Sequence, residues 1–201
     1  MRETGRVLVT APTELPVSRA EIKDHLRANV DDTEQDDLID GIIEAAVDEA
    51  EQYTWRKFCT QTWDIYFDAF PSGGGCFEVP LPPLQSVTSI TYVDADGVST
   101  VLSSALYQVD TSAEPAIIRA AYNETWPVTR DQTLQVVKVR CVVGYLTIAK
   151  IPKAIIQAIK IIAGRMYGPV TEDVVVGTIT ATVPMAAQHL LDKHAVRRMV
   201  A

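Results

Sequence analysis

The hydrophobic period of the sequence changes twice along the chain, and this change constrains the fold more than any other feature. Apolar side chains recur at helical spacing over residues 34–57. From Thr60 to about Val143 the period becomes two, which is the spacing of β-strands. Helical spacing returns over residues 152–166. The sequence therefore predicts an α+β fold: a small helical bundle with an inserted antiparallel β unit, about residues 60–145.

Capping residues mark the ends of the predicted helices. Ser18 and Glu21 have the spacing of a capping box, which predicts a short helix immediately after Ser18. The long helix of residues 34–57 follows, with Leu38 and Ile39 among its expected core residues. Pro152 suits the first position of the next helix. A last short helix is predicted from Met185.

Turn residues divide the β region into strands. Asp94-Ala95-Asp96-Gly97 lies between two alternating segments and predicts a hairpin, because Gly97 can adopt a positive φ. A later strand is predicted over residues 135–143, where Cys141 alternates with valines and is expected in the core. Trp126-Pro127 lies in a predicted loop, where the indole either packs on the β unit or stacks on a partner.

The two ends of the chain are predicted to be arms around a single domain. Residues 1–17 form the N-terminal arm, because Pro12 and Pro16 oppose helix formation there. Residues 18–168 form the α+β domain, and residues 169–201 form a C-terminal arm with a short helix. The tail from Met185 is amphipathic, and its last residues, 195–201, are apolar and basic. No other segment of the chain is expected to pack on this tail.

The charge of the chain is negative and unevenly distributed. The net charge is -8 at pH 7, whereas proteins that grip nucleic acid usually carry an excess of Lys and Arg. Within residues 1–50, thirteen Asp and Glu residues stand against five Lys and Arg residues. This face is either a solvated surface or a contact for an unlike surface of another subunit. The candidate acidic face on the long helix consists of Asp36, Asp37, Asp40, Glu44, Asp48 and Glu51.

Motifs for catalysis, metal binding and membrane insertion are missing from the sequence. The Ser-Gly-Gly-Gly run at 72–75 lacks the lysine of a phosphate-binding loop. His189 and His194 are five residues apart, which does not place them on one helix face as zinc ligands. No stretch approaches the roughly 20 apolar residues of a membrane span. We therefore predict no enzymatic activity, no catalytic or metal site, no cofactor and no membrane contact.

The order of several segments resembles phage head–tail connector proteins, which are also called adaptor or head-completion proteins. The resemblance covers almost the whole chain in order. Its segments are LPVSRAEIKDHL at 15–26, TQTW at 60–63, PPLQSVTSITYV at 82–93, Asp96-Gly97, YQVD at 107–110, Trp126-Pro127, VGY at 143–145, Ile151-Pro152 and Leu190-Leu191. Proteins of this family also occur in gene transfer agents.

This resemblance implies a structural role in a particle. Such proteins form a ring, typically dodecameric, beneath the portal protein and continue its DNA channel. The tail side of the ring receives a stopper or tail-completion protein, and double-stranded DNA passes without sequence-specific binding. The implied location is the head–tail interface of a virion, after synthesis in the cytoplasm of a bacterial host.

Two surfaces are hypothesised to serve this role. The candidate acidic face lines the channel or borders the neighbouring subunit. The C-terminal arm docks on the portal through Leu190, Leu191, Val196, Arg197, Arg198 and Val200. Two alternatives remain open on the sequence: a ring or tube subunit of another contractile or secretion apparatus, and a small-ligand or enzymatic module that uses the acidic helix.

Overall fold

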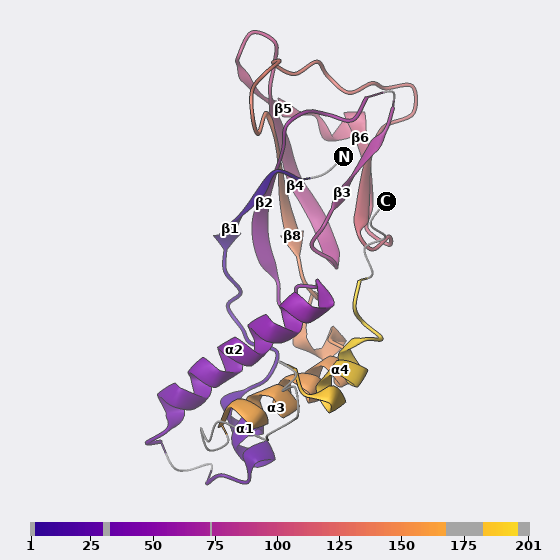
Figure 1. Cartoon of the computed structure of the whole chain (residues 1–201). Helices are drawn as coiled ribbons and strands as arrows, with labels where there is room; N and C mark the ends of the chain where they lie inside the picture. The colour runs from indigo at the N-terminus through magenta and orange to yellow at the C-terminus, as the bar shows by residue number, and fades with distance from the viewer. Residues whose placement is uncertain (1–2, 30–32, 73, 168–182, 197–201) are drawn as a thin grey trace, which may run out of the picture. The chain divides into compact units, whose positions relative to one another are not determined.

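The chain is built from two compact units, each assembled from segments that are distant in the sequence (Figure 1). The computed structural model describes residues 3–29, 33–72, 74–167 and 183–196. The β unit comprises Met1–Thr13 and Cys59–Leu146, and the helical unit comprises Glu14–Phe58 and Thr147–Ala201. With its helices and antiparallel sheets, the chain has the α+β fold predicted from the sequence.

The β unit contains two antiparallel sheets. The larger has the order β1-β2-β8-β4-β5, formed by Gly5–Thr10, Gln61–Phe67, Val137–Val143, Leu84–Val93 and Ser99–Leu102. The smaller has the order β3-β7-β6, formed by Cys76–Val79, Ala116–Ala120 and Tyr107–Asp110, with a 3-10 helix, η1, at Ser104–Leu106. The predicted hairpin is confirmed: β4 pairs with β5, and Gly97 has φ of 87°.

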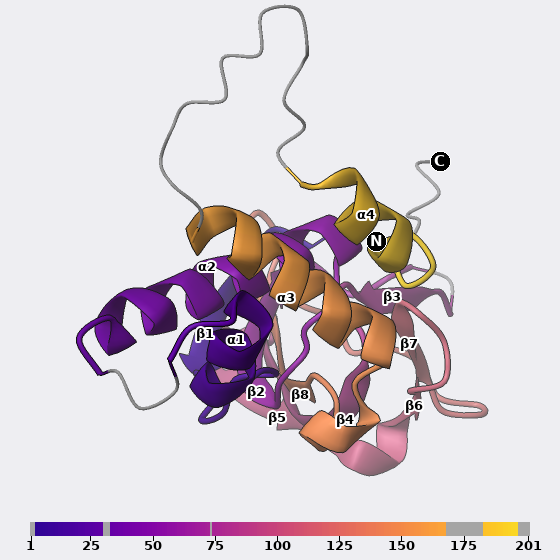
Figure 2. The ribbon, with the colours of Figure 1, turned by 90° about the horizontal axis from the view of Figure 1, so that it is seen from below.

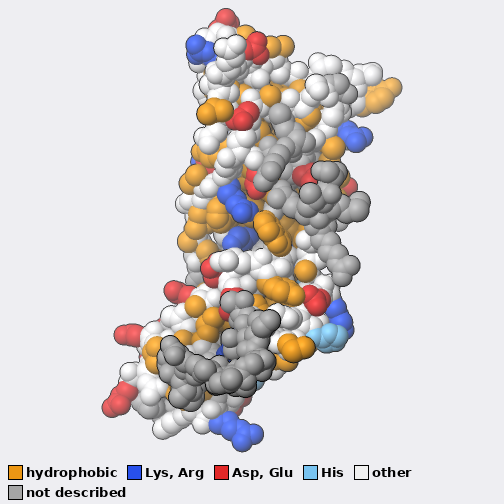
Figure 3. Space-filling view, viewed as in Figure 1, with side chains coloured by type: hydrophobic (Ala, Val, Ile, Leu, Met, Phe, Trp, Pro, Cys, Tyr) orange, Lys and Arg blue, Asp and Glu red, His pale blue; other side chains and the backbone are white. Residues whose placement is uncertain are grey.

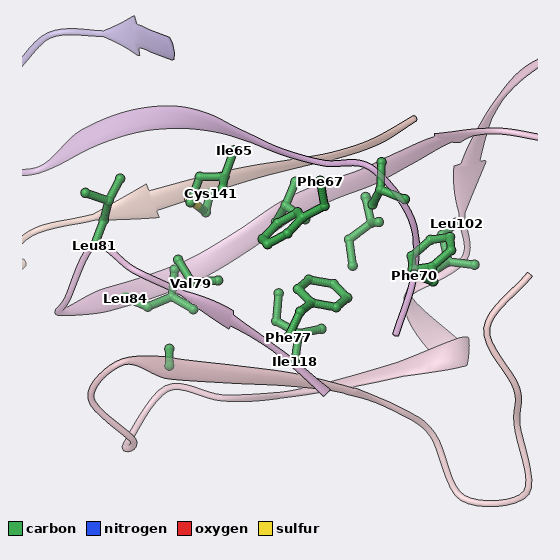
Figure 4. Close-up of a cluster of buried hydrophobic side chains, with 14 of the residues drawn as sticks. Ile65, Phe67, Phe70, Phe77, Val79, Leu81, Leu84, Leu102, Ile118 and Cys141 are labelled. Carbon is green, nitrogen blue, oxygen red and sulfur yellow. The ribbon is translucent and has the colours of Figure 1, made fainter. Parts of the chain in front are cut away.

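Alternating side chains from both sheets form the core of the β unit (Figure 4). Ile65 and Phe67 of β2 point toward Phe77 of β3, and the rings of Phe67 and Phe77 lie 5.1 Å apart between centroids. Cys141 is fully buried, as predicted. Because an apolar surrounding disfavours the thiolate, burial raises the pKa of Cys141 to about 12.

Trp126 packs on the β unit. Its indole stacks on Phe70 at a centroid distance of 4.9 Å and an interplanar angle of 4°. Its Nε1–H donates a hydrogen bond to the carbonyl oxygen of Gly75 at 3.0 Å. The loop-packing interpretation is therefore the one that the structure supports.

Strand β1 differs from the arm expected over residues 1–17. Its backbone is extended, but it pairs antiparallel with β2 from Gly5 to Thr10 and becomes part of the larger sheet. Pro12 and Pro16 exclude a helix near themselves, but they carry no information about what the preceding residues pair with. The pairing is with a strand more than fifty residues later in the chain, so local sequence signals could not reveal it.

The helical unit contains α1 (Arg19–Leu26), α2 (Asp36–Thr54), η2 (Ile148–Lys150), α3 (Lys153–Tyr167) and α4 (Met185–Leu191). Figure 2 shows α3 lying along α2 with α4 beside it. The capping box at Ser18 is confirmed: its hydroxyl accepts the Glu21 N–H, and its own N–H donates to the Glu21 carboxylate at 3.0 Å. The buried side chains of this unit include Ile22, Ile39, Ile43, Ala46, Ile155, Ile159 and Ile162. The prediction that Leu38 belongs to the core is wrong, because its side chain is 58% exposed.

Candidate interaction surfaces

The acidic face predicted on α2 is smaller in the structure than in the sequence. Asp37, Glu44 and Asp48 are exposed, and we call these three residues the exposed acidic face. Acidic side chains appear along the left side of the helical unit in Figure 3, where α2 lies in Figure 1. Asp48 also accepts a hydrogen bond from the side chain of Gln52 at 2.6 Å. These three side chains are the members of the predicted set that can meet another molecule.

Asp36 and Asp40 are half-buried and tie α2 to α1. The guanidinium of Arg19 donates to both carboxylates, with Nε at 2.8 Å from Oδ1 of Asp40, and the buried ammonium of Lys23 contacts Asp36. The Lys23 hydrogen bond lowers the pKa of Asp36, and the Arg19 hydrogen bond lowers that of Asp40. Both carboxylates are therefore used to hold two helices of the same chain together.

Glu51 does not share the exposed acidic face, contrary to the sequence prediction. Its side chain is 8% exposed. Oε1 accepts a hydrogen bond from the backbone N–H of Phe58 at 2.8 Å, and Oε2 accepts one from the ammonium of Lys57. The chain reaches this position because Trp55, at the end of α2, has a left-handed backbone with φ of 56°. Glu51 thus fixes the turn that follows α2.

The C-terminal segment up to residue 196 packs within the helical unit. Ala187 and Leu191 are fully buried, and the Tyr53 hydroxyl donates to Asp192 at 2.6 Å. That hydrogen bond raises the pKa of Tyr53. The N–H of Val196 donates to the carbonyl oxygen of Thr54 at 3.0 Å. The expectation that this segment has no packing partner in its own chain is wrong for residues 185–196.

This packing changes which predicted docking residues remain accessible. Leu191 is covered by its own chain, whereas Leu190 and Val196 are half-buried. Arg197, Arg198 and Val200 lie outside the described residues. The sequence alone could not show which docking residues are covered by their own chain and which remain accessible. The apolar composition of α4 is the same whether it packs on its own chain or on a partner.

Two grooves of about 460 Å³ each lie on the two units, one on each. The groove of the helical unit is lined by Asp48, Glu49 and Arg165 among others, and burial raises the pKa of Glu49. The groove of the β unit is lined by Phe70, Trp126 and neighbouring loop residues. A raised carboxyl pKa can accompany catalysis. Neither described lining, however, contains a histidine or cysteine beside a hydroxyl nucleophile.

Within the described part of the chain, no group of three or more His, Cys, Asp and Glu side chains could hold a metal ion. No helix within the same residues is long and apolar enough to cross a membrane.

Strand β1 carries an apolar surface that the sequence analysis missed. Val7, Leu8 and Val9 are all large and all exposed. The available signal was the run of three apolar residues within a segment assigned as an arm.

Comparison with known proteins agrees with these features. Residues 20–109 match the model of the phage gp6-like head-tail connector protein family. The resemblance predicted from the sequence is confirmed by this match, which spans α1, α2, β2 to β5 and most of β6. A search of curated proteins found no match.

The whole fold matches chains from gene transfer agent (GTA) particles. A chain of the virion of a native GTA particle is 21% identical, with a TM-score of 0.76 and 98% of both chains covered. A chain of the neck of an empty GTA particle, computed with C6 symmetry, is 20% identical with a TM-score of 0.77; 98% of this chain and 99% of that one are covered. A chain of the neck of a native particle, computed with C12 symmetry, is 22% identical with a TM-score of 0.70 and the same coverage. At these identities the likeness establishes the fold, and it covers both units.

Proposed function

We propose that this chain is a structural subunit of a ring that joins the DNA-filled head of a tailed phage or gene transfer agent to its tail. The observation that carries the proposal is the coincidence of a head–tail connector match over residues 20–109 with a full-length fold match to GTA neck chains. The ring binds the portal protein on one side and a stopper or tail-completion protein on the other. The proposed location is the virion, at the head–tail interface, and the proposed function is structural rather than enzymatic.

The exposed acidic face is suited to line a channel through which DNA passes. Lys and Arg clusters bind phosphates and would slow DNA movement, whereas Asp37, Glu44 and Asp48 repel phosphates. We assign this face to the channel or to its border with the neighbouring subunit. Asp36, Asp40 and Glu51 are excluded from this role because they hold the helical unit together.

A charge reversal tests the acidic face. Replacing Asp37, Glu44 and Asp48 together by Lys should impair ring closure or DNA ejection, measured as ring yield and as DNA released from purified particles. The matched control replaces exposed Glu78, Glu124 and Asp131 of the β unit by Lys, which changes the net charge by the same amount. Particles of the α2 variant that eject DNA as well as the control would exclude this assignment.

Portal docking is assigned to the end of the chain beyond the packed segment. Arg197, Arg198 and Val200 follow residues 185–196, and removal of α4 would expose the core of the helical unit. We therefore expect deletion of 197–201, rather than of the whole C-terminal segment, to abolish portal binding while the chain remains folded. A truncated chain that still joined the portal with wild-type affinity would overturn this assignment.

The ring itself is tested by mass. Light scattering of the purified chain mixed with its portal ring should show a complex that gains several copies of the 22.1 kDa chain. A chain that polymerises into tubes without the portal would favour a subunit of another contractile or secretion apparatus. A chain that stays monomeric beside the portal would reject the connector role.

A further inference from the structure

Strand β1 exposes apolar side chains on both of its faces. Val7 is 54% exposed, Leu8 43% and Val9 44%. Successive side chains of a strand point to opposite faces of the sheet. Three consecutive exposed residues therefore mean that neither face of β1 is covered by the described chain. Hydrophobic side chains reach the surface on the left of the β unit in Figure 3, where β1 lies in Figure 1.

β1 is also an edge strand. It is the first strand of the larger sheet, and among the described residues it pairs only with β2. Its outer edge therefore presents backbone N–H and C=O groups without a strand partner. Natural proteins usually protect such edges with charges, proline, a bulge or a covering element. β1 has one charged residue, Arg6, and its register is irregular only between Leu8 and Thr10. The edge from Gly5 to Leu8 is therefore open to pairing with another strand.

The opposite end of the same sheet offers a matching edge. β5 pairs only with β4 among the described strands. Val98 and Val101, just before and within β5, are 59% and 66% exposed. All neighbouring strands of this five-stranded sheet are antiparallel. With an odd number of strands, β1 and β5 consequently run in the same direction.

We propose that β1 of one copy of this chain pairs in parallel with β5 of the next copy, so that the larger sheets join edge to edge around the ring. The inference rests on the proposed ring function. A closed ring of more than two subunits needs two different patches on each subunit, and the two open edges of one sheet supply them. A rotation about an axis along the strands keeps their direction, so β1 meets β5 in parallel.

The charges at the ends of the two strands support the parallel arrangement. Arg6 lies near the beginning of β1, and exposed Asp96 lies in the turn immediately before β5. Parallel pairing brings the two beginnings together, so the guanidinium of one copy approaches the carboxylate of the next. Antiparallel pairing of two β1 strands would instead end at a two-fold dimer and would leave β5 uncovered.

Cross-linking tests the pairing directly. The variant Val7→Cys with Val101→Cys is made in a Cys76→Ser background, because Cys59 and Cys141 are buried and Cys76 is half-buried. Neighbouring strands lie about 4.8 Å apart, so a short bismaleimide spans the interface even if the register shifts by a residue. Rings assembled on the portal should give a ladder of covalent multimers for the double variant and none for either single variant. Dimers from Val7→Cys alone would show two-fold β1 pairing and overturn the proposal.

A second pair of variants separates this inference from the ring function. Val7→Lys with Val9→Lys should abolish ring formation on the portal. Val128→Lys with Leu134→Lys, at apolar positions elsewhere in the β unit that are even more exposed, should leave it intact. If the wild-type chain forms no ring, the proposed function itself fails. If the wild type forms rings and the β1 variant forms them equally well without a cross-linked ladder, only the edge pairing is overturned.

Discussion

Replacing Glu51 tests whether this carboxylate of α2 stabilises the fold, unlike the exposed carboxylates of the same helix. In Glu51→Ala the buried N–H of Phe58 loses its acceptor, and an unsatisfied buried donor costs about 1–3 kcal/mol. The ion pair between Glu51 and Lys57 is lost as well, which adds at most about 1 kcal/mol because the Lys57 side chain is partly exposed. The expected loss is therefore roughly 1–4 kcal/mol of the free energy of unfolding. For a chain of this size the melting temperature should fall by roughly 2–16 °C.

Urea unfolding followed by circular dichroism measures this loss, with two comparison variants. Glu44→Ala removes an exposed carboxylate from the same helix and should change the stability by less than about 0.5 kcal/mol. Glu51→Gln keeps an oxygen that can accept the Phe58 N–H but loses the charge, so it should fall between the two. If Glu51→Ala were as stable as Glu44→Ala, the assignment of Glu51 to the turn after α2 would be refuted.

Three further predictions concern the β unit. Phe77→Ala should destabilise the protein by about 3–5 kcal/mol, seen in urea unfolding, because Phe77 is 1% exposed between the two sheets. Cys76 should react quickly with a thiol reagent at pH 8, whereas Cys141, with its raised pKa and full burial, should react only after unfolding; equal rates would contradict this. The Arg140 hydrogen bond lowers the pKa of Asp64, so its stabilisation is present above the unfolded pKa of about 3.9 and is lost as the pH falls through the lower folded value. Urea midpoints between pH 7 and pH 2 should therefore fall less in Asp64→Asn than in the wild type.

Local sequence signals predicted the helices and most of the strands because the responsible interactions are close in the chain. The capping box needs only Ser18 and Glu21, and the hairpin before β5 needs only the Asp94–Gly97 turn. The alternation over β8 located the buried strand that contains Cys141. In each case residues close together in the sequence indicate the local backbone conformation, and in β8 the alternation also indicates the buried face.

The pairing of distant segments was not available from such signals. β1 pairs with β2, and α4 packs against α3. Hydrophobic periodicity indicates the buried face of a single helix or strand, but it does not indicate which distant segment covers that face. The same limit applies to the candidate sites. From its position on the helix, Glu51 was expected to be exposed. The left-handed backbone at Trp55 instead brings the Phe58 N–H to the Glu51 carboxylate. Trp55 is not a glycine, so the sequence gives no signal for this turn.

A head–tail connector subunit adds a ring to the portal. Electron microscopy of the portal alone, and of the portal mixed with the wild-type chain, shows whether this chain does so. We expect a longer particle with an additional ring at one end, around the continued channel and with the rotational symmetry of the assembled neck. Portal particles of unchanged length, with the chain remaining apart as a monomer, would contradict it.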